Sequence, residues 1–294
     1  MEWQDGGESR DIEDRRSQSG GGGGFGGGGL NPLMFLGLLR GGPIGIGIFV
    51  LIVLFGVFRG HNFLGNHNTS PAPRAAVAGP ASQQRDVKLI SYVLDDAQNT
   101  WAQIFAASDK QYRHAKLVLF RDRTTSGCGA AQASTGPFYC PADEKIYIDL
   151  GFWDELTQLG GSTSDFAKSY VITHELGHHI QNLLGIEARQ QRLARSSGNE
   201  SALSVDLELQ ADCFAGVWGH ATEQRSKITQ SDIAQALKSA AAVGDDHIQK
   251  MSGRAVSPEN WTHGSSAERE KWFTTGLESG KASSCATFNG KLSP

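Results

Sequence analysis

The sequence predicts an α+β fold, in which a small sheet is followed by helices, preceded by a glycine-rich arm and one transmembrane helix. Three observations predict it: the glycines are unevenly distributed, one stretch near the N-terminus is uncharged and apolar, and the remainder changes from strand-like to helical periodicity. Of 37 glycines, 19 lie in residues 1–65 and 18 in the other 229 residues. The first part is therefore of low complexity, whereas the second has ordinary composition and is long enough for one domain with a sizeable core.

Residues 1–40 are expected to form a disordered arm. Residues 1–18 are polar and highly charged, and residues 19–29 are almost pure glycine. Neither stretch carries enough apolar surface to offset the conformational entropy that folding removes.

Residues 41–59 are expected to form a transmembrane helix. The run from Pro43 to Phe58 is 16 residues without a charge, which gives about 24 Å of helix against a hydrocarbon core of about 30 Å. Arg40 and Arg59 can extend to the headgroups at either end.

A cleaved signal peptide is the alternative to this transmembrane helix, because Ala76-Val77-Ala78 resembles a cleavage site. That site lies 18 residues beyond the apolar run, so an uncleaved anchor is favoured.

The arginines around this segment predict its orientation. Those before it are Arg10, Arg15, Arg16 and Arg40, and those after it are Arg59 and Arg74. The balance favours a cytosolic N-terminus. Residues 60–85 are rich in Pro, Gly, Ala and Ser without periodicity and are expected to be a linker. The domain, residues 86–294, is then expected outside the cytosolic membrane.

Periodicity assigns the elements of this domain. Residues 87–107 have apolar positions at helical spacing, and residues 115–120 and 145–150 have the pattern of strands. From Asp165 the pattern is helical almost to Gly280, and breaks are expected near residues 185–198, 244–246 and 253–264.

Charge and cysteine content exclude two classes of function. The chain carries 27 basic and 31 acidic residues, and no basic patch with interleaved aromatic residues is present, so a nucleic-acid partner is not expected. None of the four cysteines forms a C-x-x-C pair, which excludes a zinc site built from four thiolates. Two disulfides in an oxidising compartment or four reduced thiols in the cytosol both remain open.

One predicted helix carries a metal-binding motif. It begins at Ser164 or Asp165, ends before Gly185, and contains the sequence H-E-x-x-H at residues 174–178. Residues four apart lie on the same helix face, so His174 and His178 can direct two imidazole nitrogens at one Zn²⁺. Glu175 is offset around the helix and can reach a water on the metal without being a ligand.

Two capped or exposed histidines on an amphipathic helix are the structural alternative. The flanking positions are apolar on most sides of the helix, as Val171, Ile172, Leu176 and Ile180 illustrate. Two imidazoles and a carboxylate on a buried helix need partners, and a metal ion provides one. Zinc is therefore favoured over the alternative.

A second predicted helix, near residues 199–222, supplies a candidate for the third metal ligand. Glu208 and Asp212 are four residues apart and face the same way, within strongly apolar surroundings. We expect Glu208 to be the third ligand and Asp212 to accept a hydrogen bond from a ligand histidine, which fixes its tautomer. His179 points away from the ligand face and is expected to be structural.

Four stretches together resemble the bacterial putative neutral zinc metallopeptidase family. They are VITHELGHHIQNLLGI at 171–186, SVDLELQADCFAGVWGH at 204–220, CGAAQASTGPFYCPADEKIYIDL at 128–150 and THGSSAEREKWFTTGLESG at 262–280. The resemblance implies a zincin-like domain with a gluzincin-like site, in which His174, His178 and Glu208 hold one Zn²⁺ per chain and Glu175 is the base. The charged opening, glycine run and single span also resemble members of this bacterial family. The membrane is then expected to be the bacterial cytoplasmic membrane, and the orientation predicted from the arginines places the catalytic domain in the periplasm or outside the cell.

The expected chemistry is hydrolysis of peptide bonds in a peptide or protein substrate. Zinc lowers the pKa of its water towards about 7, and Glu175 takes the proton as that water attacks a peptide carbonyl. A second group that stabilises the oxyanion or contacts substrate is sought among His263, Tyr170, Arg269 and His220. Residues 127–132 are a candidate edge strand for an extended substrate.

Four cysteines allow three pairings, of which we favour one. Cys128 with Cys140 closes a short loop beside the expected active-site strand, and Cys213 with Cys285 attaches the C-terminal tail to the helix of Glu208.

Two other functions remain open. The first is a metal-stabilised binding or scaffold module with the peptidase fold and little turnover, although such a site does not need Glu175. The second is a soluble secreted peptidase, if the chain is cleaved near Ala78. The sequence specifies neither the substrate nor an oligomeric state.

Overall fold

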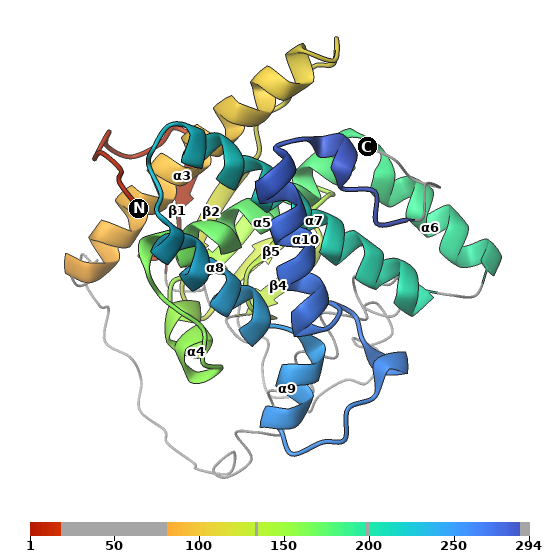
Figure 1. Cartoon of the computed structure of the whole chain (residues 1–294). Helices are drawn as coiled ribbons and strands as arrows, with labels where there is room; N and C mark the ends of the chain where they lie inside the picture. The colour runs from red at the N-terminus through yellow and green to blue at the C-terminus, as the bar shows by residue number, and fades with distance from the viewer. Residues whose placement is uncertain (19–80, 133–134, 198–199, 289–294) are drawn as a thin grey trace, which may run out of the picture.

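The fold contains a four-stranded sheet, whose strands lie in the middle of the view in Figure 1, partly behind helices. The computed structural model describes residues 1–18, 81–132, 135–197 and 200–288. The sheet order is β1-β2-β6-β5, in which β1, β2 and β6 are parallel and β5 is antiparallel to β6. A separate hairpin pairs β3 with β4. The strands are β1 (Ile12–Asp14), β2 (Lys116–Phe120), β3 (Arg123–Ser126), β4 (Gly129–Gln132), β5 (Phe138–Cys140) and β6 (Lys145–Asp149).

Alternating side chains of the two central strands give the sheet two buried faces. Leu117 and Ile146 point into the main core, which includes the apolar face of the first long helix. Val118 and Tyr147 point the other way and pack with Ala131 of the hairpin. Successive side chains of these strands therefore point to opposite faces of the sheet, as in any β-strand. Both sets of side chains are apolar because both faces of the sheet are covered.

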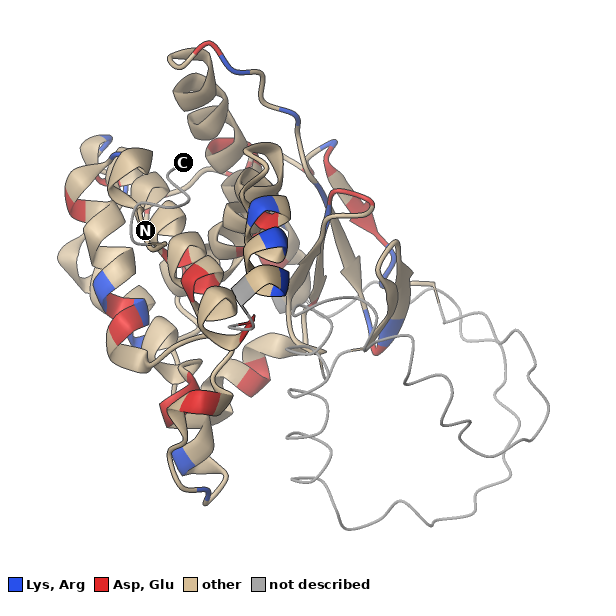
Figure 2. Cartoon of the chain, turned by 90° about the vertical axis from the view of Figure 1, so that its right-hand side faces the viewer, with Lys and Arg blue, Asp and Glu red and all other residues tan. Residues whose placement is uncertain are grey.

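The helices gather mainly on one side of this sheet, as Figures 1 and 2 show. They are α3 (Ala81–Ala106), α4 (Phe152–Gln158), α5 (Asp165–Leu183), α6 (Ile186–Ser197), α7 (Glu200–Gln224), α8 (Gln230–Ala242), α9 (Asp245–Met251) and α10 (Ser266–Ser279). Helices α7 and α10 pack backbone to backbone, because Gly216 and Gly276 lie at their crossing. A Cβ atom at Gly276 would overlap the carbonyl group of Cys213. On the face drawn in Figure 2, basic residues are interspersed with acidic ones.

Most predicted elements of the domain are confirmed, and the α+β class with them. The strands at 115–120 and 145–150 are β2 and β6, and the long helices at 87–107 and 199–222 are α3 and α7. The break expected near residues 185–198 is confirmed at its start, where Leu184 and Gly185, the latter with φ of 67°, separate α5 from α6. Within the range itself, residues 186–197 are helical and form α6. Helix α3 begins at Ala81, so the last residues of the expected linker are helical.

Both disulfides have the expected pairing. Cys128 is bonded to Cys140, with 5.8 Å between their Cα atoms, and Cys213 to Cys285, with 5.6 Å. The second bridge joins α7 to the chain after α10 and so fixes the end of the domain against the helix that carries Glu208.

The prediction that residues 1–40 form a disordered arm is wrong for residues 1–18. These residues pack along the domain, and Ile12–Asp14 form the edge strand β1, in register with residues 117–119 of β2. Their apolar surface is small, as expected. Ion pairs, two of them made by the buried carboxylate of Asp11, and pairing with β2 hold them against the domain.

Among the described residues, no helix is both long enough and apolar enough to cross a membrane. The transmembrane helix expected at residues 41–59 lies outside the described residues, as do residues 60–80 of the expected linker.

Candidate metal centre

Helix α5 carries the H-E-x-x-H sequence through the middle of the core. Its first turn is capped by Ser164, whose side chain accepts a hydrogen bond from the backbone N–H of Ala167. His174 and Glu175 are both buried. The predicted N-cap and C-terminal glycine therefore fix the length of the helix, and its apolar residues fix its depth.

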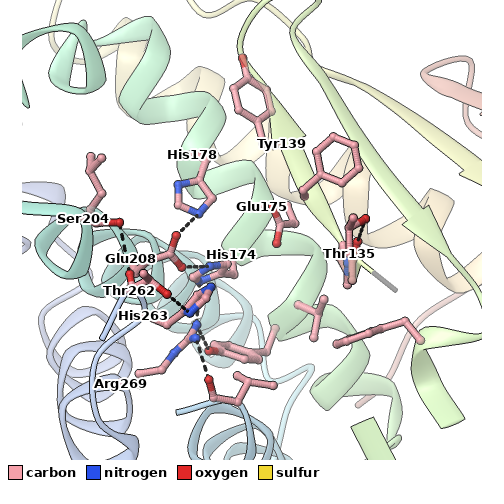
Figure 3. Close-up of a pocket in the computed structure, with 18 of the residues that line it drawn as sticks. Thr135, Tyr139, His174, Glu175, His178, Ser204, Glu208, Thr262, His263 and Arg269 are labelled. Carbon is pink, nitrogen blue, oxygen red and sulfur yellow. Dashed lines mark hydrogen bonds and ion pairs between the residues drawn. The ribbon is translucent and has the colours of Figure 1, made fainter. Parts of the chain in front are cut away.

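Gly177 allows α5 and α7 to approach closely enough to share a site. A Cβ atom at this position would lie 2.9 Å from the Cα and 3.0 Å from the carbonyl oxygen of Ala211. Glycine within a helix is costly, so its place here is explained by packing. The close approach brings the histidines of α5 opposite Glu208 of α7 (Figure 3).

His174, His178 and Glu208 converge as a potential ligand set. The Nε2 atom of His174 lies 3.2 Å from Oε2 of Glu208, and Nε2 of His178 lies 3.5 Å from Oε1 of the same carboxylate. One ligand atom from each residue lies within 4.8 Å of the others. Two imidazoles and one carboxylate are a donor set that suits Zn²⁺ and leaves a fourth position open.

The carboxylates increase the affinity of this cluster for positive charge. Burial disfavours a charged His174, but Asp212 and Glu208 outweigh burial and raise the pKa of His174 to about 10. Burial also disfavours charge on Glu208, yet His178 and His174 lower the pKa of that carboxyl well below its ordinary value. A cation is therefore stabilised among these side chains, whether it is a proton or a metal ion.

Asp212 orients His174 from the side opposite Glu208. Its Oδ1 atom lies 2.8 Å from Nδ1 of His174 and also accepts a hydrogen bond from the Tyr170 hydroxyl at 2.6 Å. Arg269 donates to both carboxylate oxygens, from Nε at 2.9 Å and from Nη2 at 3.0 Å. The carboxylate is fully buried, so these contacts hold both its position and its charge.

Gln181 gives His178 a comparable support that sequence analysis missed. Its side-chain oxygen lies 2.9 Å from Nδ1 of His178, and its side-chain nitrogen donates to the carbonyl oxygen of Leu207 at 2.7 Å. Gln181 lies three residues after His178, so the helical spacing offered a signal for it. Both histidines thus have Nδ1 occupied and Nε2 directed at Glu208.

Glu175 faces the same pocket without taking part in the cluster. Within the described part of the chain, no hydrogen bond to its carboxylate is found, and Figure 3 shows the side chain directed into the pocket. Burial raises the pKa of this carboxyl. Most of the neighbouring pocket wall is apolar, including Phe138, Phe152, Leu159, Val171, Val243 and Ile248. A carboxylate so placed holds a proton more readily than an exposed glutamate does, which suits a group that accepts a proton during a reaction.

His263 lines the pocket across from α5, held by Asp245. One oxygen of Asp245 accepts hydrogen bonds from the backbone N–H groups of Thr262, His263 and Gly264, at 2.6 to 3.0 Å. The other oxygen lies 3.4 Å from Nδ1 of His263. Burial lowers the pKa of His263, but Asp245 and Glu208 outweigh it and raise the pKa. Asp245 thus holds both the turn and the ring.

The other candidates for oxyanion or substrate contacts have different surroundings. Tyr170 and Arg269 line the pocket but direct their polar groups at Asp212. His220 is not brought to the pocket: its Nδ1 atom lies 2.7 Å from the carbonyl oxygen of Leu277. His179 contacts the Tyr139 hydroxyl and the carbonyl oxygen of Arg113. These contacts lie away from the ligand cluster and agree with the structural role expected for His179.

The strand beside the pocket is β5, rather than the segment at residues 127–132. Most of that segment forms β4, which pairs with β3, and none of it lines the pocket. Residues 135–139 do line it, and β5 is the last strand of its sheet among the described residues. The signal missed here was the short F-Y-C stretch, which is too brief for periodicity to identify as a strand.

A buried H-E-x-x-H helix faces a glutamate from a later helix, with a small mixed sheet beside it, and this arrangement defines an α+β protein with a candidate metal centre. The chain belongs to the putative neutral zinc metallopeptidase family, whose model matches residues 1–288. The described residues place His174, His178 and Glu208 as a group that can hold a metal ion, in agreement with the zinc in the family's description.

Relatives extend over all or most of the chain. The protein YpfJ of Escherichia coli K12, described as uncharacterized, is 41% identical over 296 residues, which cover 99% of this chain and all of YpfJ. The protein Rv2575 of Mycobacterium tuberculosis H37Rv, also described as uncharacterized, is 44% identical over 189 residues, or 60% of this chain and 64% of Rv2575. No solved structure matches.

Proposed function

We propose that this chain is a zinc-dependent peptidase. The observation that carries the proposal is that His174, His178 and Glu208 converge in the same pocket that Glu175 faces. A purely structural metal site would not need an additional buried carboxylate beside its ligands. Zinc held by these three residues supplies acidification of a water molecule and polarisation of a carbonyl group.

The side chains of this pocket can then carry the proton transfers of peptide hydrolysis. Glu175 accepts a proton from a water molecule as the oxygen of that water attacks the peptide carbonyl carbon. The raised pKa of the Glu175 carboxyl suits it to hold that proton. As the C–N bond breaks, Glu175 donates the proton to the departing amine. Asp212 and Gln181 keep the imidazoles oriented during both steps.

An extended peptide fits the position of β5. The outer edge of β5 has no neighbouring strand among the described residues, and the residues leading into it line the pocket. A peptide that adds to this edge would place its backbone beside Glu175 and an apolar side chain against the pocket wall. We therefore propose an endopeptidase with a preference for apolar residues next to the cleaved bond.

His263 is the candidate that best fits stabilisation of the oxyanion. It lines the pocket, and Asp245 together with the backbone of residues 262–264 fixes the ring. A fixed donor aimed at developing charge acts mainly on the transition state.

Replacing His263 with alanine is expected to lower kcat by about 10²- to 10³-fold with KM little changed. Steady-state kinetics on a fluorogenic peptide would measure both constants, and metal analysis would check that zinc content is unchanged. The control is His247→Ala, because His247 is also half-buried but bonds to the carbonyl oxygen of Leu159 outside the ligand cluster. A raised KM with unchanged kcat would assign His263 to substrate binding instead.

We also propose attachment to the bacterial cytoplasmic membrane, with the domain on the oxidising side. The uncharged run from Pro43 to Phe58 supports attachment. The two disulfides support an oxidising compartment, because such bonds are rare in the cytosol.

The decisive test of the peptidase proposal uses the full chain purified in detergent without chelator. We expect one zinc per chain, cleavage of an unstructured protein such as casein, loss of activity with 1,10-phenanthroline and recovery when zinc is restored. Bound zinc without cleavage across a diverse peptide library would instead favour a binding or scaffold module. A chain that binds no zinc at neutral pH would overturn the assignment.

A further inference from the structure

Residues 1–18 precede the apolar run in the sequence but belong to the domain that follows it. Strand β1 pairs in parallel with β2, with Ile12 opposite Leu117 and Asp14 opposite Leu119. Backbone hydrogen bonds to β2 continue beyond both ends of β1. Leu117 donates to the carbonyl oxygen of Asp11 at 2.8 Å, and Arg15 donates to that of Leu119 at 2.7 Å.

The charged side chains of this segment have specific partners on three elements of the domain. Asp11 is buried and lies 2.7 Å from both Lys116 and His114. Ser9 donates to Asp95 of α3 at 2.6 Å, and Glu13 pairs with Lys145 of β6 at 2.6 Å. Burial would raise the pKa of Asp11, but its cationic partners outweigh it and lower the pKa. These polar contacts explain how a segment with little apolar surface is held.

Two of the four arginines that favoured a cytosolic N-terminus, Arg15 and Arg16, are part of the same contacts. Arg15 lies 2.7 Å from Glu13 and hydrogen-bonds Thr124 of β3. Arg16 pairs with Asp14 at 2.6 Å. Their presence before the apolar run is therefore accounted for by docking on the sheet, and they need not be signals of membrane orientation.

The described residues that flank residues 19–80 contact the same part of the domain, the end of β2. Arg15, near the first end, bonds to the backbone of Leu119 at the end of β2. Gln83, near the second end, accepts a hydrogen bond from Arg121, which directly follows β2. A chain that crossed a membrane once between these points would separate β1 from its neighbouring strand.

We propose that residues 1–18 and the domain at residues 81–288 lie on the same side of the membrane, joined through β1. This replaces the expected arrangement in which a single crossing leaves the N-terminus in the cytosol and the domain outside. Whatever path residues 19–80 take, it begins and ends on one side. The inference depends on the docking of residues 1–18 on the domain and stands whether or not the chain is a peptidase.

Accessibility to a membrane-impermeant maleimide tests the proposal in cells. Single cysteines are introduced into the full chain at exposed positions, Ser17→Cys in the N-terminal segment and Lys110→Cys in the domain. We expect both to be labelled, or both to be protected, in intact spheroplasts, and both to be labelled after lysis. Labelling of one and protection of the other before lysis would overturn the proposal.

A cross-link tests the docking itself. Ser9→Cys with Asp95→Cys places two thiols where the native side chains touch, and a protease site inserted after residue 65 permits separation of the two parts. After oxidation in membranes with copper phenanthroline and cleavage, we expect more than half of the N-terminal fragment to stay attached until reduction. Ser9→Cys with Lys110→Cys is the matched control and should release the fragment. Release from the Ser9/Asp95 variant as well would overturn docking of β1.

Discussion

Replacing Glu175 with glutamine is expected to lower peptide hydrolysis by about 10²- to 10⁴-fold while zinc content stays at one per chain. Glutamine has nearly the same shape but cannot accept the proton of the attacking water. Glu175 makes no hydrogen bond among the described residues that this substitution would break, and it lies outside the convergent cluster of His174, His178 and Glu208. The loss should therefore appear in kcat, with metal binding and stability preserved.

The matched control for Glu175 is Glu187→Gln. Glu187 is also buried, lines the same pocket and has its pKa raised by burial. It is expected to change activity less than about tenfold, because a carboxyl that does not transfer the proton contributes only through the local field. Kinetics and zinc analysis of both variants separate the two roles. Equal activity of wild type and Glu175→Gln would show that the cleavage does not come from this site.

The potential ligands and the base were predictable because their geometry is local. His174 and His178 are four residues apart on one helix, and so are Glu208 and Asp212, so each pair shares a face whatever the tertiary structure. The apolar flanks indicated that both helices are buried, and Gly177 lies where they meet. Spacing plus burial was therefore sufficient to bring these side chains together.

The partners that come from distant segments could not be predicted in the same way. Arg269 was only one of four candidates for an oxyanion or substrate contact, and its guanidinium reaches Asp212 across 57 residues of sequence. Asp245 organises the turn of His263 through backbone N–H groups, a contact that no side-chain pattern encodes. Such contacts depend on how α9 and α10 pack, and periodicity describes only the faces that these helices present.

Strand β1 was missed for a different physical reason. Its three residues, Ile12–Asp14, have one apolar side chain, and the surrounding composition is that of a disordered segment. Its place is specified by Lys116, Lys145 and a free edge of β2, all of which lie more than 100 residues later. A strand whose stability comes from its neighbours leaves little trace in its own sequence.

Replacing Asp212 with asparagine is expected to weaken zinc binding by about 10- to 100-fold and to lower the free energy of unfolding of the zinc-free protein by about 3–5 kcal/mol. Asparagine cannot accept from His174, Tyr170 and Arg269 together, and it leaves the Arg269 guanidinium buried without a countercharge. Competition with a fluorescent zinc chelator measures the first effect, and urea denaturation the second. Asp206→Asn is the control on the same helix, because the Asp206 side chain contacts none of these groups.

The pH dependence of stability tests the charge on Asp212. Burial would raise the pKa of its carboxyl, but Arg269 and His174 outweigh burial and lower it. The carboxylate therefore stabilises the folded protein above the ordinary pKa of aspartate, and this stabilisation is lost as the pH falls through the lower folded value. The difference in stability between wild type and Asp212→Asn should narrow at acid pH.

A double variant separates the two effects of Asp212. Adding Arg269→Met to Asp212→Asn should restore part of the stability, because the uncompensated charge is gone. It should not restore the zinc affinity, because His174 still lacks its carboxylate partner. Recovery of both would mean that Asp212 serves only to neutralise Arg269.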